Sequence, residues 1–234
     1  MTDRNQILSN IRKGRALSND QMRRPLFRER NRGELWARWR DIEAQNAGRM
    51  DELVKAFKRE CEDVAGKAYV ARNHDEACGF VSTIIKDSGA KKVIRWDSAL
   101  LEKLGIDHLI HSIGTGSIPQ SQNNLTAKAD LGISEAAFGL ADTGTLVLRA
   151  SPGRDRSTSL LPPSHIAVLE SKKILFTLDD LLVRLLLDFV EKGDLGTCIT
   201  LITGPSRTAD IELNLVHGIH GPKSLHVIIL NAYS

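Results

Sequence analysis

The residues best placed for chemistry follow a predicted strand over residues 197–203. This strand ends at Gly204, and the next residues include Ser206, Arg207 and Thr208. We expect a helix to begin at Ser206 or Thr208, which would leave unpaired backbone N–H groups at the carboxyl edge of a sheet, where open α/β folds bind ligands. Arg207 would add a planar cation for a carboxylate or phosphate. The pattern predicts an anion site, although an ordinary helix cap explains it equally well.

A second cluster is the run Asp142, Thr143, Gly144 and Thr145, which lies between two apolar stretches. Asp142 could act as an acid, a base or a ligand-orienting carboxylate in a cleft, with Thr143 and Thr145 as donors. The alternative is a tight turn in which Asp142 caps its own backbone. Glu135 is a further candidate catalytic carboxylate, although its neighbours in the sequence demand no special geometry.

Two histidines three residues apart, His217 and His220, form a third cluster. A stable metal site needs at least three ligands, and no Cys, Asp or Glu nearby completes a known pattern, so we expect no metal here. With a pKa near 6.5, these histidines could bind an anion or handle protons. His165 begins a predicted strand, where a structural role is expected. The sequence has no P-loop, no His-Glu-x-x-His and no complete dinucleotide fingerprint.

From Gly66 onward, segments with strand character alternate with segments of helical periodicity. This alternation is typical of an α/β fold with a mostly parallel sheet and flanking helices. We predict helices over residues 74–87, 98–104 and 178–192, strands over 67–72, 91–96, 197–203 and 226–231, and a loop over 112–124.

The first part of the chain has a different pattern. Between residues 34 and 64, apolar residues recur at three- and four-residue spacing, with Gly48 as an interruption. We therefore predict an N-terminal helical arm over residues 1–64 and an α/β domain over 65–234. Trp36 and Trp39 share one face of this arm and are expected to pack against other elements.

Composition excludes several classes of protein. The net charge is +3, and residues 1–60 hold 15 Lys and Arg against 9 Asp and Glu, an interleaving that fits a solvated helix face better than a nucleic-acid surface. No apolar run approaches the roughly 20 residues of a membrane span, and no secretory signal is visible, so we expect a cytoplasmic protein. Cys61, Cys78 and Cys198 lack the spacing of a zinc or iron–sulfur site, so no cofactor is expected on this chain.

Three segments together resemble the lactate-utilization (LUD) domain family, in particular its stand-alone LutC/YkgG type. They are GISEAAFGLADTGTLVL (132–148), SLLPPSHIAVLE (159–170) and TGPSRTADIELNLVHGIHGPKSLHVIIL (203–230). The resemblance covers residues 65–231. It implies a fold similar to the NagB/RpiA/CoA-transferase-like superfamily.

The resemblance also implies a role in oxidising L-lactate to pyruvate beside sister proteins that carry iron–sulfur clusters. Because this chain lacks their cysteine clusters, we expect a non-redox component that binds a small anionic ligand. Two alternatives stay open. One is a stand-alone isomerase, acyl- or CoA-transferase or ligase with Asp142 or Glu135 as base or nucleophile, and the other is a scaffold whose helical arm docks the iron–sulfur proteins.

Overall fold

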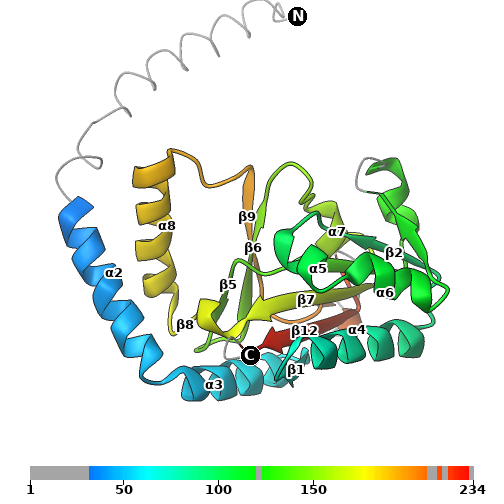
Figure 1. Cartoon of the computed structure of the whole chain (residues 1–234), viewed down its shortest axis with the longest axis horizontal. Helices are drawn as coiled ribbons and strands as arrows, with labels where there is room; N and C mark the ends of the chain where they lie inside the picture. Colours follow the sequence, from blue (N-terminus) through cyan, green and yellow to red (C-terminus); the bar gives the residue numbers. More distant parts are fainter. Residues whose placement is uncertain (1–31, 120–122, 210–214, 218–220, 232–234) are drawn as a thin grey trace, which may run out of the picture.

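The computed structural model describes residues 32–119, 123–209, 215–217 and 221–231 (Figure 1). Its centre is a six-stranded sheet in which every pairing is parallel and the strand order is β1-β12-β7-β4-β2-β3. The strands are β1 (Lys67–Ala71), β2 (Lys92–Arg95), β3 (Gly116–Ile118), β4 (Leu131–Glu135), β7 (Ser164–Glu170) and β12 (Ser224–Leu230). The predicted parallel sheet is therefore confirmed. Its strands β4, β7 and β12 are hydrophobic because helices and a second sheet cover them.

A second sheet of four strands stands beside the first, and the sequence pattern did not reveal it. Its order is β8-β5-β6-β9, and the β5–β6 and β6–β9 pairings are antiparallel. Its members are β5 (Phe138–Leu140), β6 (Thr145–Ala150), β8 (Ile174–Leu175) and β9 (Cys198–Ile202). A short antiparallel pair, β10 (Arg207–Ala209) and β11 (Leu215–His217), follows β9.

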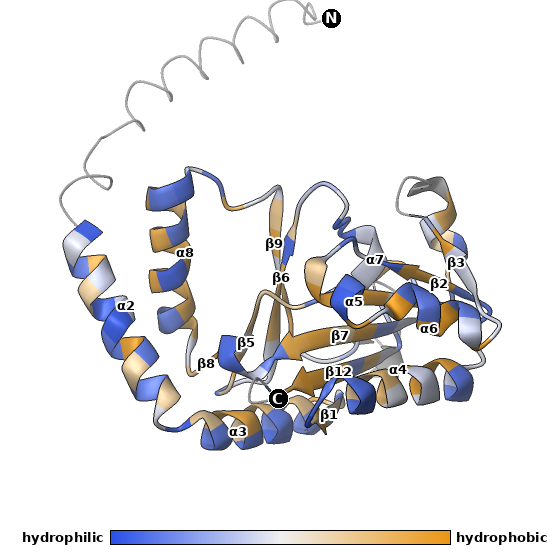
Figure 2. Cartoon of the chain, viewed as in Figure 1, coloured by the Kyte–Doolittle hydropathy of each residue, from blue (hydrophilic) through white to orange (hydrophobic). Residues whose placement is uncertain are grey.

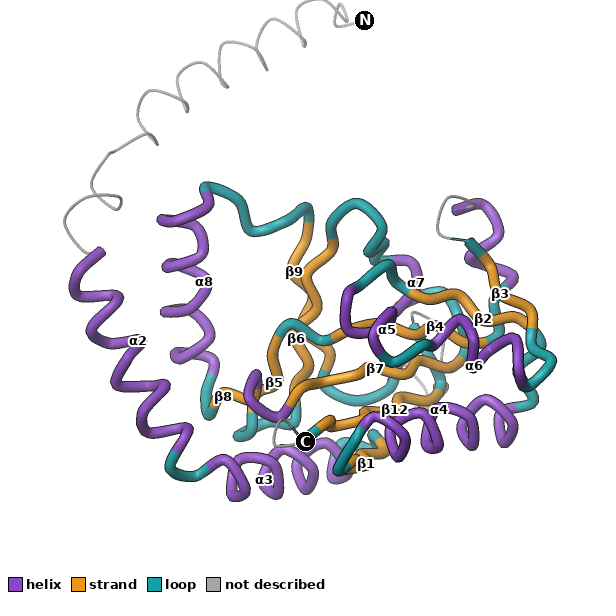
Figure 3. The backbone as a smooth tube through the Cα atoms, viewed as in Figure 1, coloured by secondary structure: helices purple, strands orange, loops and turns teal. Residues whose placement is uncertain are grey.

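Helices surround the two sheets. They are α2 (Arg32–Ala47), α3 (Met50–Asp63), α4 (His74–Ser88), α5 (Ala99–Lys103), α6 (Ile106–Ser112), α7 (Ser157–Leu160) and α8 (Leu178–Lys192), with 3₁₀ turns at Asn123–Lys128 and Ser171–Lys173. Figure 3 shows α3 and α4 running along one side of the main sheet, while α2 and α8 stand together beside the second sheet. The second sheet therefore lies between the α2–α8 pair and the main sheet.

Local signals fix the helix ends. The Thr177 side chain accepts from Asp180 N while the Asp180 side chain accepts from Thr177 N, a capping box that starts α8. Gly193, with φ of 70°, ends the helix in the left-handed conformation that glycine tolerates. The predicted helix over residues 178–192 is confirmed, as is the interruption of the arm at Gly48 between α2 and α3. The predicted loop over 112–124 is partly wrong because it contains β3.

Hydrophobic residues gather in two main clusters. The larger is centred on the main sheet, whose strands β7 and β12 are largely orange in Figure 2, and it includes Phe57 and Cys61 of α3. The smaller joins α2, α8 and the second sheet around Trp39, which is 6% exposed, so the predicted packing of this tryptophan is confirmed. Among the described residues, no helix has the length and apolar character needed to cross a membrane.

Candidate functional site

The segment after β9 does not form the predicted helix. The residues after Gly204 continue into β10, whose Arg207 pairs with His217 of β11. Gly204 itself has φ of +81°, and a Cβ at this position would lie 2.5 Å from Val64 O at the end of α3. The helix at Ser206 or Thr208 is therefore wrong, because backbone pairing between β10 and β11 takes up the N–H groups that a helix start would have left free.

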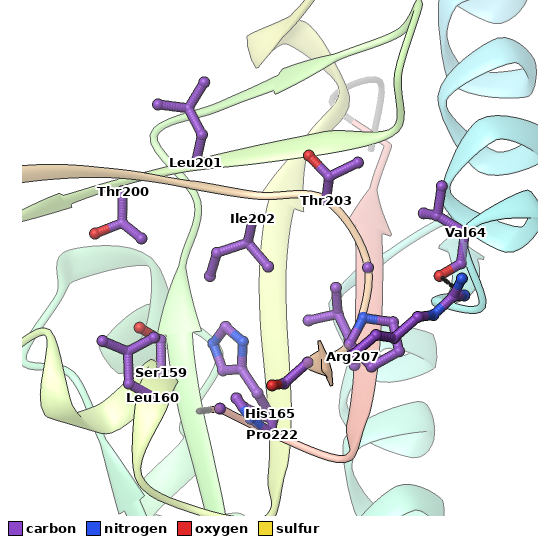
Figure 4. A pocket seen from close by; sticks show the side chains of 15 residues that line it. Val64, Ser159, Leu160, His165, Thr200, Leu201, Ile202, Thr203, Arg207 and Pro222 are labelled. Atoms are coloured by element: carbon purple, nitrogen blue, oxygen red, sulfur yellow. Dashed lines mark hydrogen bonds between the residues drawn. The ribbon is translucent and has the colours of Figure 1, made fainter. Parts of the chain in front are cut away.

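A cavity of about 430 Å³, here called the β9 cavity, lies along this segment (Figure 4). Its walls come from residues 200–207, from Ser159 and Leu160, from His165 near the start of β7, and from Leu225 near the start of β12. His165 and Leu225 lie at the amino ends of the parallel strands β7 and β12. The expected place of the segment at the carboxyl edge of the sheet is therefore also wrong, since β9 belongs to the second sheet and runs antiparallel to β6.

The predicted ligand-binding residues of this segment have partners within the protein. Arg207 Nη2 donates to Val64 O at 2.5 Å, and Figure 4 shows its side chain turned toward Val64. An arginine at the last carbonyls of a helix is a common C-terminal cap. Ser206 N donates to Pro222 O at 2.9 Å. Ser206 and Arg207 still line the β9 cavity, together with Gly204.

The run that begins at Asp142 forms the turn between β5 and β6. Asp142 and Thr143 are exposed, and Thr143 Oγ1 donates to Asp142 Oδ1 at 3.2 Å. Thr143 Oγ1 also lies 2.8 Å from Thr145 Oγ1, which lies 2.8 Å from Thr203 Oγ1. A chain of hydroxyls thus links the turn to the wall of the β9 cavity, while Asp142 lines none of the cavities described here. These contacts favour the tight-turn interpretation.

His165 is fully buried at the back of the β9 cavity. Its Nε2 lies 2.8 Å from Ser134 Oγ, and its Nδ1 has no hydrogen-bond partner in the described part of the chain. Burial, assisted by nearby His226, lowers the pKa of His165 to about 3, so the imidazole is neutral. Of the other predicted residues, Thr208 and His217 belong to β10 and β11 by their backbone, and His220 lies outside the described residues.

A second cavity of about 690 Å³ lies at the carboxyl edge of the main sheet, where α/β folds bind ligands, and we call it the cationic cavity. Trp96, which follows β2, and Glu135, which ends β4, form part of its floor, and α8 closes the other side. Five cationic side chains and three carboxylates line it: Arg149, Arg154, Lys173, Arg184 and Lys192 with Glu135, Asp188 and Asp194. The excess of positive charge attracts anions.

Glu135 is the predicted carboxylate that the structure places in this cavity. Lys173 Nζ donates to Glu135 Oε1 at 2.8 Å and also contacts Glu170 at 2.8 Å. Burial opposes the charge of Lys173, but these two carboxylates outweigh burial and raise the pKa of Lys173 above its usual value. Arg154 is held more loosely, by a 3.8 Å contact to Glu135 and by a 3.3 Å bond from Nε to Asp97 O.

The opposite wall of the cationic cavity is organised by Asp188 of α8. Its carboxylate, only 3% exposed, contacts Arg149 at 2.6 Å, Arg184 at 2.5 Å and Lys192 at 3.7 Å. Since three cations share one acid, this wall keeps a positive excess. Sequence reasoning missed all four residues. The only available signal was the i, i+4 spacing of Arg184, Asp188 and Lys192 on one helix face.

The chemistry of the cationic cavity is that of a carboxylate or phosphate site. Arg154 has a planar guanidinium that can make two parallel bonds to a carboxylate. Glu135 and Lys173 can accept and donate hydrogen bonds to a neighbouring hydroxyl. Within the residues that the structure describes, no group of three or more His, Cys, Asp and Glu is arranged to hold a metal ion.

Comparisons with known proteins agree on one family. A family model described as the LUD domain matches residues 54–230. The chain is 32% identical to a protein named lactate utilization protein C from Macrococcus caseolyticus, over 76% of this chain and 78% of that protein. It is 28% identical to another protein of that name from Halalkalibacterium halodurans, over 76% of this chain and 80% of that one.

Among solved structures, a crystal structure of a DUF162 family protein from Deinococcus radiodurans is similar with a TM-score of 0.56. The two chains are 19% identical, and the match covers 77% of this chain and 98% of that one. This likeness concerns the fold alone, and it agrees with the parallel sheet flanked by helices.

Proposed function

The chain belongs to the LUD domain family, and from this premise we propose that it is a non-redox component of L-lactate utilization that binds a small carboxylate in the cationic cavity. Relatives named lactate utilization protein C support the process. The observation that carries the binding role is the group of five cations against three carboxylates at the carboxyl edge of the main sheet. Lactate is an anion, opposite in charge to the cavity, and it has a hydroxyl beside its carboxylate.

Arg154 is the residue that we propose for the carboxylate. Its present contacts are long, so a ligand can replace them at little cost, whereas Arg149 and Arg184 are tied to buried Asp188 by short bonds. The hydroxyl of lactate would then face Glu135, whose carboxylate accepts hydrogen bonds and is oriented by Lys173. In this proposal Glu135 is the ligand-orienting carboxylate, a role that the sequence also suggested for Asp142.

Oxidation of lactate to pyruvate removes two electrons and two protons. Cys61, Cys78 and Cys198 are the three cysteines of the sequence, one fewer than the four thiolates that hold a typical iron–sulfur cluster. We therefore assign the electrons to iron–sulfur centres on partner proteins and the protons to solvent. This chain holds the substrate anion or its product for those partners.

The proposal is tested first by titrating the protein with L-lactate and pyruvate in a calorimeter. A charge-assisted bond is worth about 1.5–3 kcal/mol, so Arg154→Ala should weaken binding at least tenfold. Arg156→Ala removes an exposed arginine two residues away that does not line the cavity, and it should bind like the wild type. Equal binding by Arg154→Ala and Arg156→Ala would count against the site.

The second test is lactate-dependent dye reduction by anaerobically reconstituted iron–sulfur partners, with and without this chain. We expect reduction to depend on the chain and to fall with Arg154→Ala. Reduction that is unchanged when the chain is omitted would contradict the assignment to the lactate-oxidising machinery.

A second candidate function is an enzyme in its own right, and the Glu135–Lys173 pair favours it. A carboxylate paired with an ammonium in a cavity at a sheet's carboxyl edge is suited to proton transfer in an isomerase or to acyl transfer. Turnover by the isolated chain on sugar-phosphate or acyl-CoA substrates, abolished by Glu135→Gln, would favour this alternative over the binding role.

A further inference from the structure

We propose that the β9 cavity is a second ligand site, for an uncharged molecule that carries a carbonyl oxygen on an apolar body, the chemistry of a quinone head group. The site lies at the amino ends of β7 and β12, whereas the cationic cavity lies at the carboxyl edge of the same sheet. The inference goes beyond the proposed function and does not rest on it.

The buried imidazole of His165 sets the polar requirement of this cavity. In the described part of the chain, Ser134 Oγ makes one side-chain bond, to His165 Nε2, and both residues are fully buried. The Ser134 hydroxyl proton is best satisfied by donating to Nε2, which places the imidazole proton on Nδ1. Nδ1 is then a buried donor for which the described residues supply no acceptor, an unfavourable state. A ligand with an acceptor oxygen can meet this need.

Apart from Arg207, the described residues that line the cavity carry no charged side chain. Hydroxyls come from Ser159, Thr200 and Ser206, while Leu160 and Ile202 supply apolar surface. Figure 4 shows the imidazole of His165 pointing into the space between the α7 segment and β9.

Among the described residues that line the cavity, Arg207 has the one guanidinium, and it does not face a ligand. It is directed to Val64 O, where it caps α3. Of the residues that the structure describes here, none would offer a free cation to an anion in the β9 cavity, so its desolvation would be costly. A neutral carbonyl compound loses far less on transfer.

The state of His165 reinforces this selectivity. Because burial lowers its pKa to about 3, the imidazole offers a neutral N–H rather than a positive charge at working pH. The volume of about 430 Å³ is within the range of pockets that hold compact organic ligands, and two fused rings fit that scale. Ile202 and Leu160 supply the apolar surface around this space, whereas the side chain of Leu201 points to the other face of β9 (Figure 4).

The test compares two probes that share one ring system. One is 2,3-dimethyl-1,4-naphthoquinone, whose substituted ring positions leave no site for thiol addition, and the other replaces one methyl with a propionate chain. Binding of each to the full-length protein is measured by calorimetry at pH 7.5. We expect the neutral quinone to bind at least tenfold more tightly than the anionic one. Equal affinities, or tighter binding of the anion, would overturn the proposal.

Two variants locate the binding. Thr200→Phe keeps a strand-forming residue in β9 but fills the cavity, and it should weaken binding of the neutral quinone at least tenfold. Thr197→Phe makes the same change at an exposed position before β9, outside the cavity, and should have no effect. Unchanged binding by Thr200→Phe would overturn the site.

A third variant tests the polar anchor. Ser134→Ala combined with His165→Phe removes both members of the buried pair, and it should weaken quinone binding while folding is followed by circular dichroism. If this variant unfolds, Thr200→Phe still decides the case. Saturating lactate should not displace the quinone. Displacement by lactate would show that the two ligands share one site and would overturn this inference while leaving the lactate-binding role intact.

Discussion

At the scale of single residues, Asp188 holds together the cations that make the cationic cavity. Its buried carboxylate contacts Arg149, Arg184 and Lys192. Removing one partner of a buried ionic group leaves the others uncompensated, which costs about 3–5 kcal/mol. We therefore expect Asp188→Asn to lower the free energy of unfolding by about 3 kcal/mol, measured by urea denaturation.

The matched control is Asp194→Asn. Asp194 Oδ1 accepts from Gly196 N in an exposed loop, and an asparagine keeps that oxygen. Its stability should change by less than about 0.5 kcal/mol. A loss of stability in Asp188→Asn as small as that in Asp194→Asn would mean that the cluster around Asp188 does not stabilise the fold.

Two histidines of the main sheet make stability depend on pH. Burial lowers the pKa of His165 to about 3 and, with Lys67 nearby, that of His226 to about 4, whereas both titrate near 6.5 when unfolded. Between these values the unfolded chain binds more protons than the folded one, so stability is complete above pH 6.5 and falls as the pH drops. From pH 7 to pH 5, His165 alone should cost on the order of 2 kcal/mol.

This pH dependence is measured by urea unfolding across pH 4–8. His226 faces Tyr69, whose hydroxyl lies 3.3 Å from its Nδ1, and His165 faces Ser134. The double variant Ser134→Ala/His165→Phe should make the curve shallower while leaving the contribution of His226, and His108→Gln, at an exposed position, should not change it. A wild-type curve that is flat between pH 7 and 5 would contradict the burial of both groups.

At the scale of elements, the turn between β5 and β6 is fixed by its packing on α3. Gly144 has φ of +62°, and a Cβ there would lie 2.2 Å from Cys61 N. Gly89, at the end of α4, has nearly the same φ, +63°, with nothing within 4 Å of a Cβ. We expect Gly89→Ala to cost about 1–2 kcal/mol from backbone strain alone, and Gly144→Ala to cost about 2–3 kcal/mol more from the overlap.

Thermal unfolding of the two glycine variants separates strain from crowding, because the backbone conformation is matched. Equal melting temperatures would mean that α3 can move away from the turn. In that case the hydroxyl chain from Thr143 to Thr203 should be equally adaptable.

Sequence patterns predicted the elements whose signals are local. The bounds of α8 follow from Thr177, Asp180 and Gly193, and the parallel sheet follows from the alternation of strands and helices. The segment after Gly204 could not be predicted in this way. Its conformation depends on pairing with β11 and on the end of α3, which are distant in sequence, so the hydroxyl-rich pattern was equally compatible with a helix start.

The candidate site shows the same limit. Glu135 was identified from the sequence as a candidate carboxylate. Its partners Lys173, in the 3₁₀ turn after β7, and Arg154, in the loop after β6, are brought to it only by the fold. Arg149 lies on β6 and Arg184 on α8, so the cationic cavity exists only once both sheets and α8 are in place. Side-chain type gave the chemistry, and tertiary packing gave the location.

At the scale of the whole molecule, the two main hydrophobic clusters divide the chain into regions of different stability. The cluster around β7 and β12 contains most of the fully buried strand residues, whereas the cluster of α2, α8 and the second sheet is smaller. Regions with fewer buried contacts open at lower free energy than the core. The α2–α8 region should therefore open before the main sheet does.

Trp39 is the residue through which this division can be tested. It is buried between α2 and α8, and the guanidinium of Arg184 lies 5.1 Å from its ring centre. Truncation of a buried aromatic costs about 3–5 kcal/mol. In native-state hydrogen exchange, Trp39→Ala should accelerate exchange of α8 amides at least tenfold more than that of β12 amides, and Trp36→Ala, at a half-buried position, should do so less. Equal acceleration in α8 and β12 would instead indicate a single cooperative unit. Because α8 forms one wall of the cationic cavity, Trp39→Ala should also bind lactate more weakly than the wild type does.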